Sequence, residues 1–377
     1  MDCLKFDVFF TILIHVFNTE SYLMPTLTRK EFIKKASLGL LLVSNPGLIK
    51  RVKWEKDAET IFTVNGQLKA KEMGSTLVHE HLLSSFGLDA MEPGQYDEEK
   101  ALTEVVPYLK YLQSLGCNTI VDCTAAYFGR NVRLLRKLSQ KSGIQILTNT
   151  GIYGAASDRY VPQSVRDQSP DQLAAQWIDE FNNGIQGTDI KPGFLKCGVD
   201  SGPLSEIDGK LVRAAAITHL ETGLLLQIHT SNNPEAVFQQ LNILEEEGVS
   251  PTAWVWVHAN KVTNSKPLIE AARRGAWISL DNLKTVNYFN GKESGSNTLS
   301  MHYDHLEVFR ESGLLDRVLL SHDGSLFPPE GKDKRPMDIL YNSFIPMMEA
   351  GGFSQQEIDK IIIHNPAEAF TLSIRRR

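Results

Sequence analysis

Eight short apolar runs alternate with longer amphipathic segments between residues 75 and 323, and this alternation predicts an α/β fold. Within that class we expect a closed (β/α)8 TIM barrel preceded by a short N-terminal β-hairpin. From the first strand end at His79 to the last at Asp323, the units average about 35 residues, close to the roughly 31 of a typical barrel. An open doubly wound sheet is the alternative, but no Gly-x-Gly-x-x-Gly motif follows the first strand.

The hairpin comes first along the chain. Asn65 and Gly66 stand between apolar residues within 63–68, and Asn-Gly in this setting is a strong hairpin signal. The predicted barrel strands are short and apolar. They are Ser75–His79, Thr119–Cys123, Ile144–Thr148, Gly193–Cys197, Leu224–His229, Ala253–His258, Ala276–Leu280 and Val318–Asp323.

Helices are predicted between these strands wherever apolar residues recur at helical spacing. The best defined are Glu98–Leu115, Val132–Lys141, Pro170–Gly184, Ser205–Glu221 and Pro234–Glu247. Several are followed by glycine, the residue that commonly ends a helix in the left-handed conformation. Gly143 and Gly223 are two such positions.

The composition indicates a globular enzyme or binding protein. Lys plus Arg number 39 and Asp plus Glu 45, so the net charge is −6 and offers no footprint for nucleic acid or an anionic membrane. With 42% hydrophobic residues the 377-residue chain buries a substantial core. The four cysteines show no Cys-x-x-Cys pairing, which argues against a disulfide framework or a zinc-thiolate site.

Residues 1–58 are predicted to be a leader, and residues 59–377 the barrel domain. A basic region containing Arg29 and Lys30 precedes an apolar run at Leu38–Val43, the order found in export signals. It resembles a twin-arginine signal with Lys30 in place of the second arginine. We expect translation to start at Met24 and the protein to be exported to the periplasm, with no stable membrane span; a cytoplasmic protein with a packed N-terminal helix is the alternative.

Polar side chains stand at the ends of five predicted strands, where barrel enzymes place their active sites. His79 and His81 are alternate residues of the first strand, so they share a face while Glu80 points away. Together these strand ends direct four histidines, one lysine and one aspartate toward one end of the barrel. The residues on the other four strands are Lys196, His229, His258 and Asp323.

These residue types favour a metal site, since imidazole and carboxylate bind zinc and similar divalent ions. Four histidines and an aspartate exceed the needs of one catalytic zinc, so we predict two ions; zinc is expected, and manganese, cobalt or iron accept the same ligands. Two ions about 3.5–4 Å apart take a bridging anion. Lys196 as an ammonium would repel both ions, whereas carboxylation by CO2 turns it into an anionic oxygen donor. The six remaining histidines are expected to have ordinary structural roles.

The motif residues resemble the phosphotriesterase family of the amidohydrolase superfamily, which includes lactonases. The His-x-His run in Gly74–Leu82 is similar to the family's opening motif, and Asn365–Phe370 is similar to its terminal helix. The resemblance covers roughly residues 60–372. Lys196, His229, His258 and Asp323 also recur in the family's order.

The resemblance implies a role for each of these residues. One ion is bound by His79, His81 and Asp323, and the more exposed ion by His229 and His258, with carboxylated Lys196 bridging the two. A hydroxide shared by the ions attacks a carbonyl or phosphorus centre, and Asp323 accepts the proton, a role that typically adds about 10²–10⁴-fold. The resemblance also implies a homodimer.

Three further residues are predicted to contact a small-molecule substrate. Tyr153, after the third strand, resembles the tyrosine that family lactonases place near the hydroxide, while Arg130 and Asp281 follow other strands. A packing or loop role is the alternative for each. The predicted activity is hydrolysis of a lactone, carboxylic ester or phosphotriester. The alternatives are an amidase or phosphodiesterase with the same metal site, and a binding protein on a relic barrel.

Overall fold

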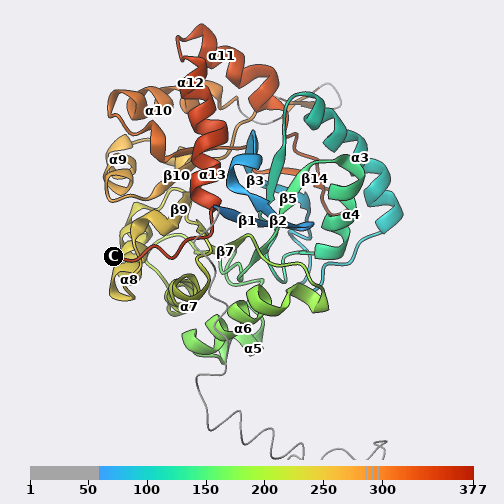
Figure 1. Ribbon diagram of the computed structural model, residues 1–377, viewed down its shortest axis with the longest axis vertical. Coiled ribbons are helices and arrows are strands. Elements are labelled where there is room, and N and C mark those ends of the chain that lie inside the picture. The colour runs from blue at the N-terminus through green and yellow to red at the C-terminus, as the bar shows by residue number, and fades with distance from the viewer. Residues whose placement is uncertain (1–58, 286, 290–291, 295–296) are drawn as a thin grey trace, which may run out of the picture. The chain divides into compact units, whose positions relative to one another are not determined.

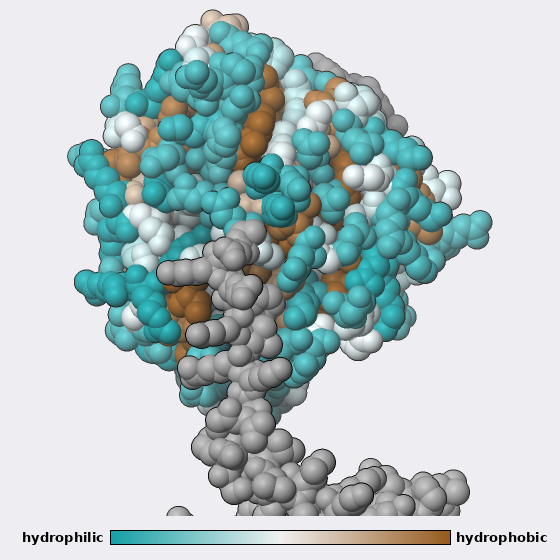
Figure 2. Space-filling view, viewed as in Figure 1, coloured by the Kyte–Doolittle hydropathy of each residue, from teal (hydrophilic) through white to brown (hydrophobic). Residues whose placement is uncertain are grey.

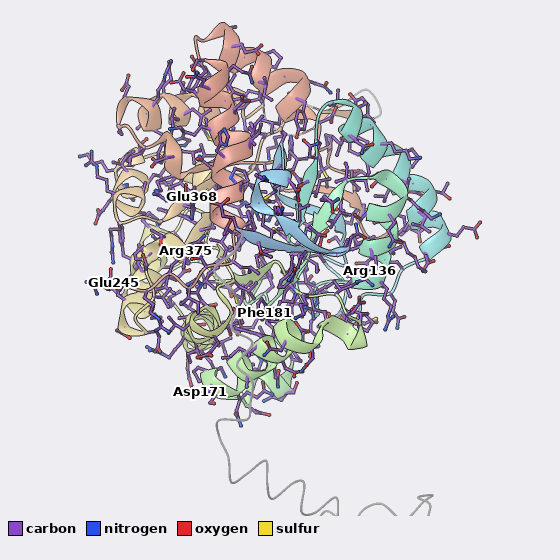
Figure 3. The ribbon with its side chains drawn as sticks, in the orientation of Figure 1. Arg136, Asp171, Phe181, Glu245, Glu368 and Arg375 are labelled. Atoms are coloured by element: carbon purple, nitrogen blue, oxygen red, sulfur yellow. The ribbon has the colours of Figure 1, made fainter. Side chains whose placement is uncertain are left out.

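The computed structural model of the protein describes residues 59–377, apart from 286, 290–291 and 295–296. The predicted leader, with its export signal and start at Met24, lies outside the described residues. Within them, no helix is both long and apolar enough to cross a membrane. Most of the face seen in Figure 2 is hydrophilic, with small apolar patches between the charged side chains. Several of these charged groups are labelled in Figure 3, among them Arg136, which pairs with Asp189 at 2.8 Å.

The predicted (β/α)8 barrel is confirmed (Figure 1). Its third and eighth strand positions are each made of two short strands. All pairings within it are parallel, in the orders β14-β3-β4-β5 and β6-β7-β8-β9-β10-β13. The two split positions therefore join the halves into a closed sheet. The strands are β3 (Thr76–Leu83), β4 (Thr119–Asp122), β5 (Gln145–Leu147), β6 (Asn149–Thr150), β7 (Phe194–Gly198), β8 (Leu226–His229), β9 (Trp254–Val257), β10 (Trp277–Leu280), β13 (Val318–Leu320) and β14 (Gly324–Phe327).

Helices surround the barrel (Figure 1). They are α3 (Glu98–Ser114), α4 (Val132–Ser142), α5 (Gln163–Arg166), α6 (Pro170–Asn183), α7 (Glu206–Thr222), α8 (Pro234–Glu246), α9 (Ser265–Arg273), α10 (Leu299–Glu311), α11 (Ile345–Ala350), α12 (Gln355–Asp359) and α13 (Asn365–Phe370). The five helices predicted in detail agree within one residue at each end. Gly143 and Gly223 end α4 and α7 in the left-handed conformation, as expected.

Strand alternation sends side chains to two separate layers. Val121, Leu225 and Leu319 pack inside the barrel, whereas their sequence neighbours Ile120 and Leu226 pack outward against the helices. The inner layer also contains Ile61 from the hairpin and Phe370 from α13. These two elements therefore close one end of the barrel and leave the other end for the site.

The predicted hairpin is present, with its turn one residue earlier than the Asn-Gly pair suggests. β1 (Thr60–Thr63) pairs antiparallel with β2 (Gly66–Lys69), and Thr63 stands opposite Gly66. Val64 and Asn65 therefore form the turn. Val64 is buried, and its N–H donates to the carbonyl of Ile146 at 2.8 Å, so a contact with the barrel decides the register of the turn.

Two details of the eighth strand and its neighbourhood differ from the prediction. The strand expected at 318–323 ends at Leu320, because Asp323 adopts φ 55° and donates its N–H to the carbonyl of His79 at 3.1 Å. The chain then re-enters the barrel as β14. In addition, the connection after β10 contains an antiparallel pair that the sequence did not predict, β11 (Asn287–Phe289) with β12 (Lys292–Ser294).

Candidate metal centre and active site

A cavity of about 380 Å³ contains all six predicted metal-site residues among its lining. It is formed at the carboxyl ends of the barrel strands and by the loops that follow them. We call these six residues the floor of the site. They are His79, His81, Lys196, His229, His258 and Asp323.

A register shift in β3 aims two histidines into the cavity. Pairing between β3 and β4 slips between Leu77 and Glu80, so Val78 packs in the barrel interior while its neighbour His79 also faces inward. His81 returns to the cavity two residues later. As predicted, Glu80 points the other way and is fully buried.

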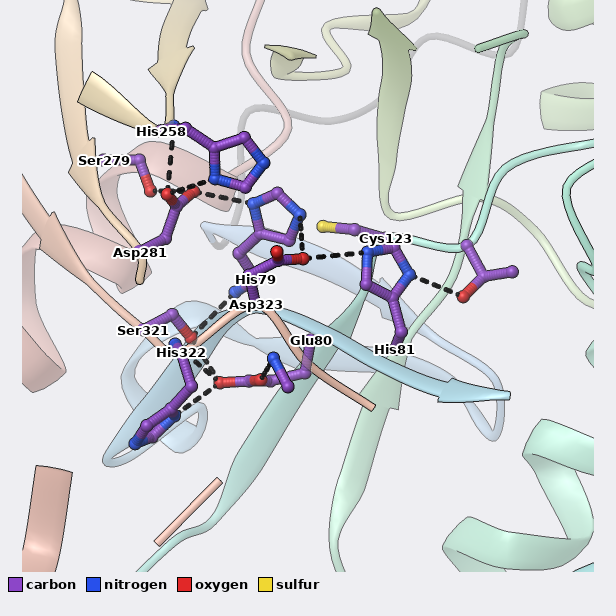
Figure 4. Close-up of polar contacts among 12 residues, drawn as sticks. His79, Glu80, His81, Cys123, His258, Ser279, Asp281, Ser321, His322 and Asp323 are labelled. Carbon is purple, nitrogen blue, oxygen red and sulfur yellow. Dashed lines mark hydrogen bonds and ion pairs between the residues drawn. The ribbon is translucent and has the colours of Figure 1, made fainter. Parts of the chain in front are cut away.

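Asp281, which follows β10, holds two of the floor histidines (Figure 4). Its Oδ2 accepts from Nδ1 of His79 at 2.7 Å, and its Oδ1 accepts from both the backbone N–H and Nδ1 of His258, at 2.9 and 2.8 Å. Because a carboxylate only accepts, both rings carry their proton on Nδ1 and present the lone pair of Nε2. The grouping of these three side chains is therefore a hydrogen-bonded support and not itself a metal site.

Thr124 fixes His81 in the same tautomer. The hydroxyl of Thr124 donates to the carbonyl of Leu83 at 2.7 Å, so it accepts from Nδ1 of His81 at 2.9 Å. The Nε2 lone pair of His81 consequently faces the cavity. A second group orienting each ligand histidine in this way is typical of metal sites.

The two β3 histidines and Asp323 converge in a way that suits a cation. Nε2 of His81 lies 3.4 Å from Oδ1 of Asp323, and Nε2 of His79 lies 3.8 Å from the same oxygen. Each nitrogen presents a lone pair, so three acceptors face one another without a proton between them. A divalent ion is the group that this donor set fits.

Burial favours the neutral form of three floor histidines, His79, His81 and His229, and neutral imidazole is the form that binds metal. Burial, reinforced by the charge of Lys196, lowers the pKa of His79 to about 3. Burial likewise lowers the pKa of His81 and holds the pKa of His229 well below its ordinary value. Burial alone would raise the pKa of Asp281, but His258 and His79 outweigh it and hold that pKa well below the ordinary value.

Lys196 lies in the middle of this group with its amine buried. Its side chain is 1% exposed, and Nζ lies 3.3 Å from Nε2 of His79. No carboxylate among the described residues comes within 4.0 Å of that nitrogen. Gly151 passes so close to the Lys196 carbonyl that any side chain there would collide with it. The backbone around the lysine is therefore tightly constrained while its amine lacks a counter-ion.

Glu80 ties the first strand to the last on the outer side of the barrel (Figure 4). Its Oε1 accepts from the Ser321 hydroxyl and from Nδ1 of His322, both at 2.7 Å, and its Oε2 accepts from the Gly324 N–H at 2.7 Å. These bonds flank Asp323 on both sides. His322 therefore supports the site from behind, consistent with the structural role expected for it.

Two of the three predicted substrate contacts are not in the cavity lining. Asp281 is fully buried beneath His79 and His258, so it supports the floor and does not face substrate. Arg130 is 2% exposed and pairs with Glu92 at 2.9 Å and Glu180 at 2.7 Å. These placements correct both predictions. A charged residue that follows a strand was expected to face the pocket, but hydrogen-bond partners direct each of these two side chains into the protein.

Tyr153 does line the cavity. Its ring stacks on Phe128 with centroids 5.2 Å apart and meets His229 edge-on at 5.4 Å. A side chain at Gly198 would collide with the tyrosine ring, so this glycine makes room for it. With Phe86, which also packs edge-on against Phe128 at 5.5 Å, these residues form the aromatic wall, defined as Phe86, Phe128 and Tyr153.

The mouth of the cavity carries charged residues that the sequence did not single out. They come from the segment after β9 and the loop after β14. We call them the rim, defined as Lys261, Lys332, Asp333 and Arg335. Neither these residues nor Thr124 belong to a motif, so the only sequence signal that could have found them is their position after barrel strands.

The barrel and its histidine–aspartate cluster define a class of (β/α)8 hydrolases built to hold metal at the strand ends. A model of the phosphotriesterase family matches residues 59–370. The chain therefore belongs to the phosphotriesterase family, whose members are binuclear metal-dependent hydrolases, and the resemblance inferred from the motifs is confirmed.

Proteins similar to this chain are named for different activities. The chain is 28% identical to an aryldialkylphosphatase of Saccharolobus solfataricus over 81% of this chain and 97% of that protein. It is 27% identical to a phosphotriesterase homology protein of Escherichia coli K12, over 79% of this chain and 98% of that protein. It is 26% identical to an N-acetyltaurine hydrolase of Xenopus tropicalis, over 82% of this chain and 97% of that protein. The family thus includes both a phosphatase and an amide hydrolase by name.

Proposed function

We propose that this protein is a binuclear metal-dependent hydrolase of ester bonds, acting on a lactone, a carboxylic ester or a phosphotriester. The observation that carries the proposal is the convergence of two imidazole lone pairs and Oδ1 of Asp323 within 3.4 and 3.8 Å. Buried Lys196 lies beside them and has no carboxylate partner among the described residues. The aryldialkylphosphatase relative supports ester chemistry.

The floor divides into two ligand sets. His79, His81 and Asp323 hold the first ion. His229 and His258, whose rings meet edge-on at 4.6 Å, hold the second. Two histidines are one ligand short of the three protein ligands typical of a catalytic zinc. Lys196, carboxylated by CO2, would supply the missing oxygen ligand and would be shared by the two ions.

Zinc is the expected metal, although manganese, cobalt and iron accept the same donors. When bound, the two ions supply Lewis acidity toward the scissile group and activate water as the nucleophile. Asp323 accepts the proton released from that water through its Oδ1 or Oδ2. Arg335, whose Nη1 lies 3.2 Å from Oδ2 of Asp323, stabilises this carboxylate in its charged form. Tyr153 and the rest of the aromatic wall exclude water from the side of the cavity next to His229.

Amide hydrolysis is the second candidate function, and a specific observation favours it. The N-acetyltaurine hydrolase of Xenopus tropicalis aligns with this chain over almost its full length. The same floor accommodates an amide carbonyl, because the metal chemistry does not depend on the leaving group. The two functions differ in which substrate has the higher kcat/KM.

A single preparation tests the proposal. Metal content is measured by mass spectrometry on the folded chain, and the same sample is assayed against a matched lactone, carboxylic ester, phosphotriester, phosphodiester and amide. We expect about two ions per chain and the highest kcat/KM on an ester or lactone. Fewer than one ion per folded chain contradicts the metal site, and a preference for the amide supports the second candidate.

The lysine bridge has its own test in two variants of one residue. Lys196→Ala removes the bridge and leaves space, so activity is lost and short carboxylic acids such as acetate or propionate restore part of it. Lys196→Met also removes the bridge but fills the space, so the same acids do not restore activity. A metal-replete, active Lys196→Ala enzyme contradicts the bridging role.

We also propose that residues 59–377 form the catalytic domain, that residues 1–58 direct export, and that the enzyme is a homodimer. The basic and apolar segments that end near Val43 support export. Cell fractionation of the full chain, with a version that begins at Met24 as a comparison, tests the leader. Light scattering on the purified enzyme measures the oligomeric state.

A further inference from the structure

The rim has the opposite charge balance from the protein as a whole. The chain has 45 acidic against 39 Lys and Arg residues, yet the rim contains three cations and one carboxylate. A cavity lined by one sign of charge concentrates ligands of the other sign. Two bound metal ions make the interior more positive still. The cavity is therefore electrostatically suited to an anionic ligand.

Lys332 lacks the carboxylate partner that a neighbouring lysine has. Lys334, two residues further along the same loop, pairs with Glu104 at 2.7 Å and is absent from the cavity lining. Among the residues that the structure describes, no carboxylate oxygen lies within 4.0 Å of the Lys332 amine. Its side chain instead extends across the mouth toward Gly87, in the loop after β3, where its Cε would lie 3.9 Å from a Cβ at that glycine.

The loop that carries Lys332 is held in place at its base. Ser325 and Arg335 exchange backbone hydrogen bonds of 2.9 and 2.8 Å, which close the loop, and the N–H of Lys332 donates to the carbonyl of Pro329 at 3.1 Å. Arg335 is 51% exposed, and its Nη1 reaches Asp323 at 3.2 Å. The two cations therefore project from an ordered loop into one mouth.

Lys261 comes from a different segment and is fixed relative to the floor. It ends the 3-10 turn η4 (Ala259–Lys261), which directly follows His258, and its N–H donates to the carbonyl of His258 at 3.2 Å. Its charge contributes to lowering the pKa of His229, after burial and the neighbouring His258 and Lys196. No described carboxylate lies within 4.0 Å of Lys261 either. This cation stands on the side of the proposed second ion.

We propose that the substrate carries an anionic oxygen group, a carboxylate or phosphate, at the end remote from the scissile bond, and that Lys261, Lys332 and Arg335 bind it. The apolar part of the substrate lies against the aromatic wall, and the scissile group reaches the floor. A cavity of about 380 Å³ takes one small molecule, so a single ligand spans wall, floor and rim. This inference rests on the proposed function and specifies the class of substrate for the same site.

Three esters that differ only in their remote end test the inference on the metal-loaded enzyme. They are para-nitrophenyl pentanoate, which is neutral, mono-para-nitrophenyl glutarate, which ends in a carboxylate, and para-nitrophenyl phosphonobutanoate, which ends in a phosphonate. The measured quantity is the ratio of kcat/KM for each anionic ester to that for the neutral one. We expect a ratio of roughly ten or more at low salt, falling as ionic strength rises. The two anionic arms distinguish a carboxylate from a phosphate as the recognised group.

Neutralising the rim should lower this ratio. Lys332→Gln and Lys261→Gln each reduce it roughly two- to fivefold, mainly through KM, because each removes an exposed ion pair made equally in ground and transition states. The matched control is Lys334→Gln, which leaves the ratio unchanged. A wild-type enzyme that prefers the neutral ester, or a double Lys261→Gln/Lys332→Gln variant with an unaltered ratio, overturns the inference. If none of the three esters is hydrolysed, this inference is overturned; if the lactone and phosphotriester assays described above fail as well, the proposed ester function falls with it.

Discussion

The floor and the rim of the cavity hold their charged groups in contrasting ways. On the floor, His79 and His258 share the carboxylate of Asp281, and His81 is held by Thr124. On the rim, Lys261 and Lys332 extend into the mouth with no described carboxylate within 4.0 Å. The same cavity thus combines three histidines that buried side chains hold in place with two lysines that have no carboxylate partner among the described residues.

The difference teaches which part of the cavity sets which property. Buried polar groups need hydrogen-bond partners, so the geometry of the floor is determined before any ligand arrives. Exposed cations interact with water in the absence of substrate and exchange it for an anion on binding. We therefore expect changes to the floor to affect metal binding and the reaction, and changes to Lys261, Lys332 or Asp333 of the rim to affect only the choice of substrate.

The largest expected effect comes from removing the support shared by two floor histidines. Asp281→Ala leaves Nδ1–H of both His79 and His258 without an acceptor, so metal affinity falls by about 10–100-fold or more and activity falls with it. Competition with a chelator measures the affinity. Ser279→Ala, which removes only a donor 2.9 Å from the same carboxylate, is the control and has a smaller effect. Unchanged metal affinity in the Asp281 variant would falsify the supporting role.

Arg130 provides the next test, because it joins the segments that carry the cavity walls. Arg130→Met leaves Glu92 and Glu180 without their cation, and we expect a loss of about 3 kcal/mol in the free energy of unfolding, at the low end for a buried pair because both carboxylates are partly exposed. Urea denaturation measures it. The control is Arg213→Met, which also removes a cation from two glutamates, Glu246 and Glu247, but at the surface. A loss no larger than that of the control contradicts the structural assignment of Arg130.

A smaller effect is expected where only one floor histidine loses its support. Thr124→Val keeps the shape of the side chain but removes the acceptor for Nδ1–H of His81, so metal affinity at the first ion falls roughly tenfold. Metal release monitored by a chromogenic chelator measures the change. Thr148→Val is the matched control, since the buried hydroxyl of Thr148 has no hydrogen-bond partner among the residues described. Equal effects of the two variants would show that Thr124 does not orient His81.

The smallest effect is expected at the carboxylate of the rim. Asp333 is the one carboxylate among the rim residues. Asp333→Asn removes its negative charge, so the preference for anionic over neutral esters rises about twofold. Metal content stays at the wild-type value. A rise in the preference that disappears at high salt supports the electrostatic origin, whereas a change in metal content contradicts the separation between rim and floor.

Sequence reasoning was most successful where a local rule applied. The alternation of apolar runs and helices predicted the barrel, and the rule that barrel strands end in catalytic residues selected all six floor residues from one chain. It failed for Arg130 and Asp281, because a charged residue after a strand can face either the cavity or a partner elsewhere in the protein. The direction depends on Glu92, Glu180 and the two histidines, whose positions no local pattern reveals.

The sequence by itself determined the barrel, the hairpin and the identity of the floor, because strand and helix periodicity and strand-end position are properties of neighbouring residues. Only the tertiary structure decided what supports the floor and what charges the rim. The bond between His79 and Asp281 joins residues 202 apart, and that between Glu80 and His322 joins residues 242 apart. Such contacts exist only after the barrel closes, when its first and last strands meet and the loops take their places around the cavity.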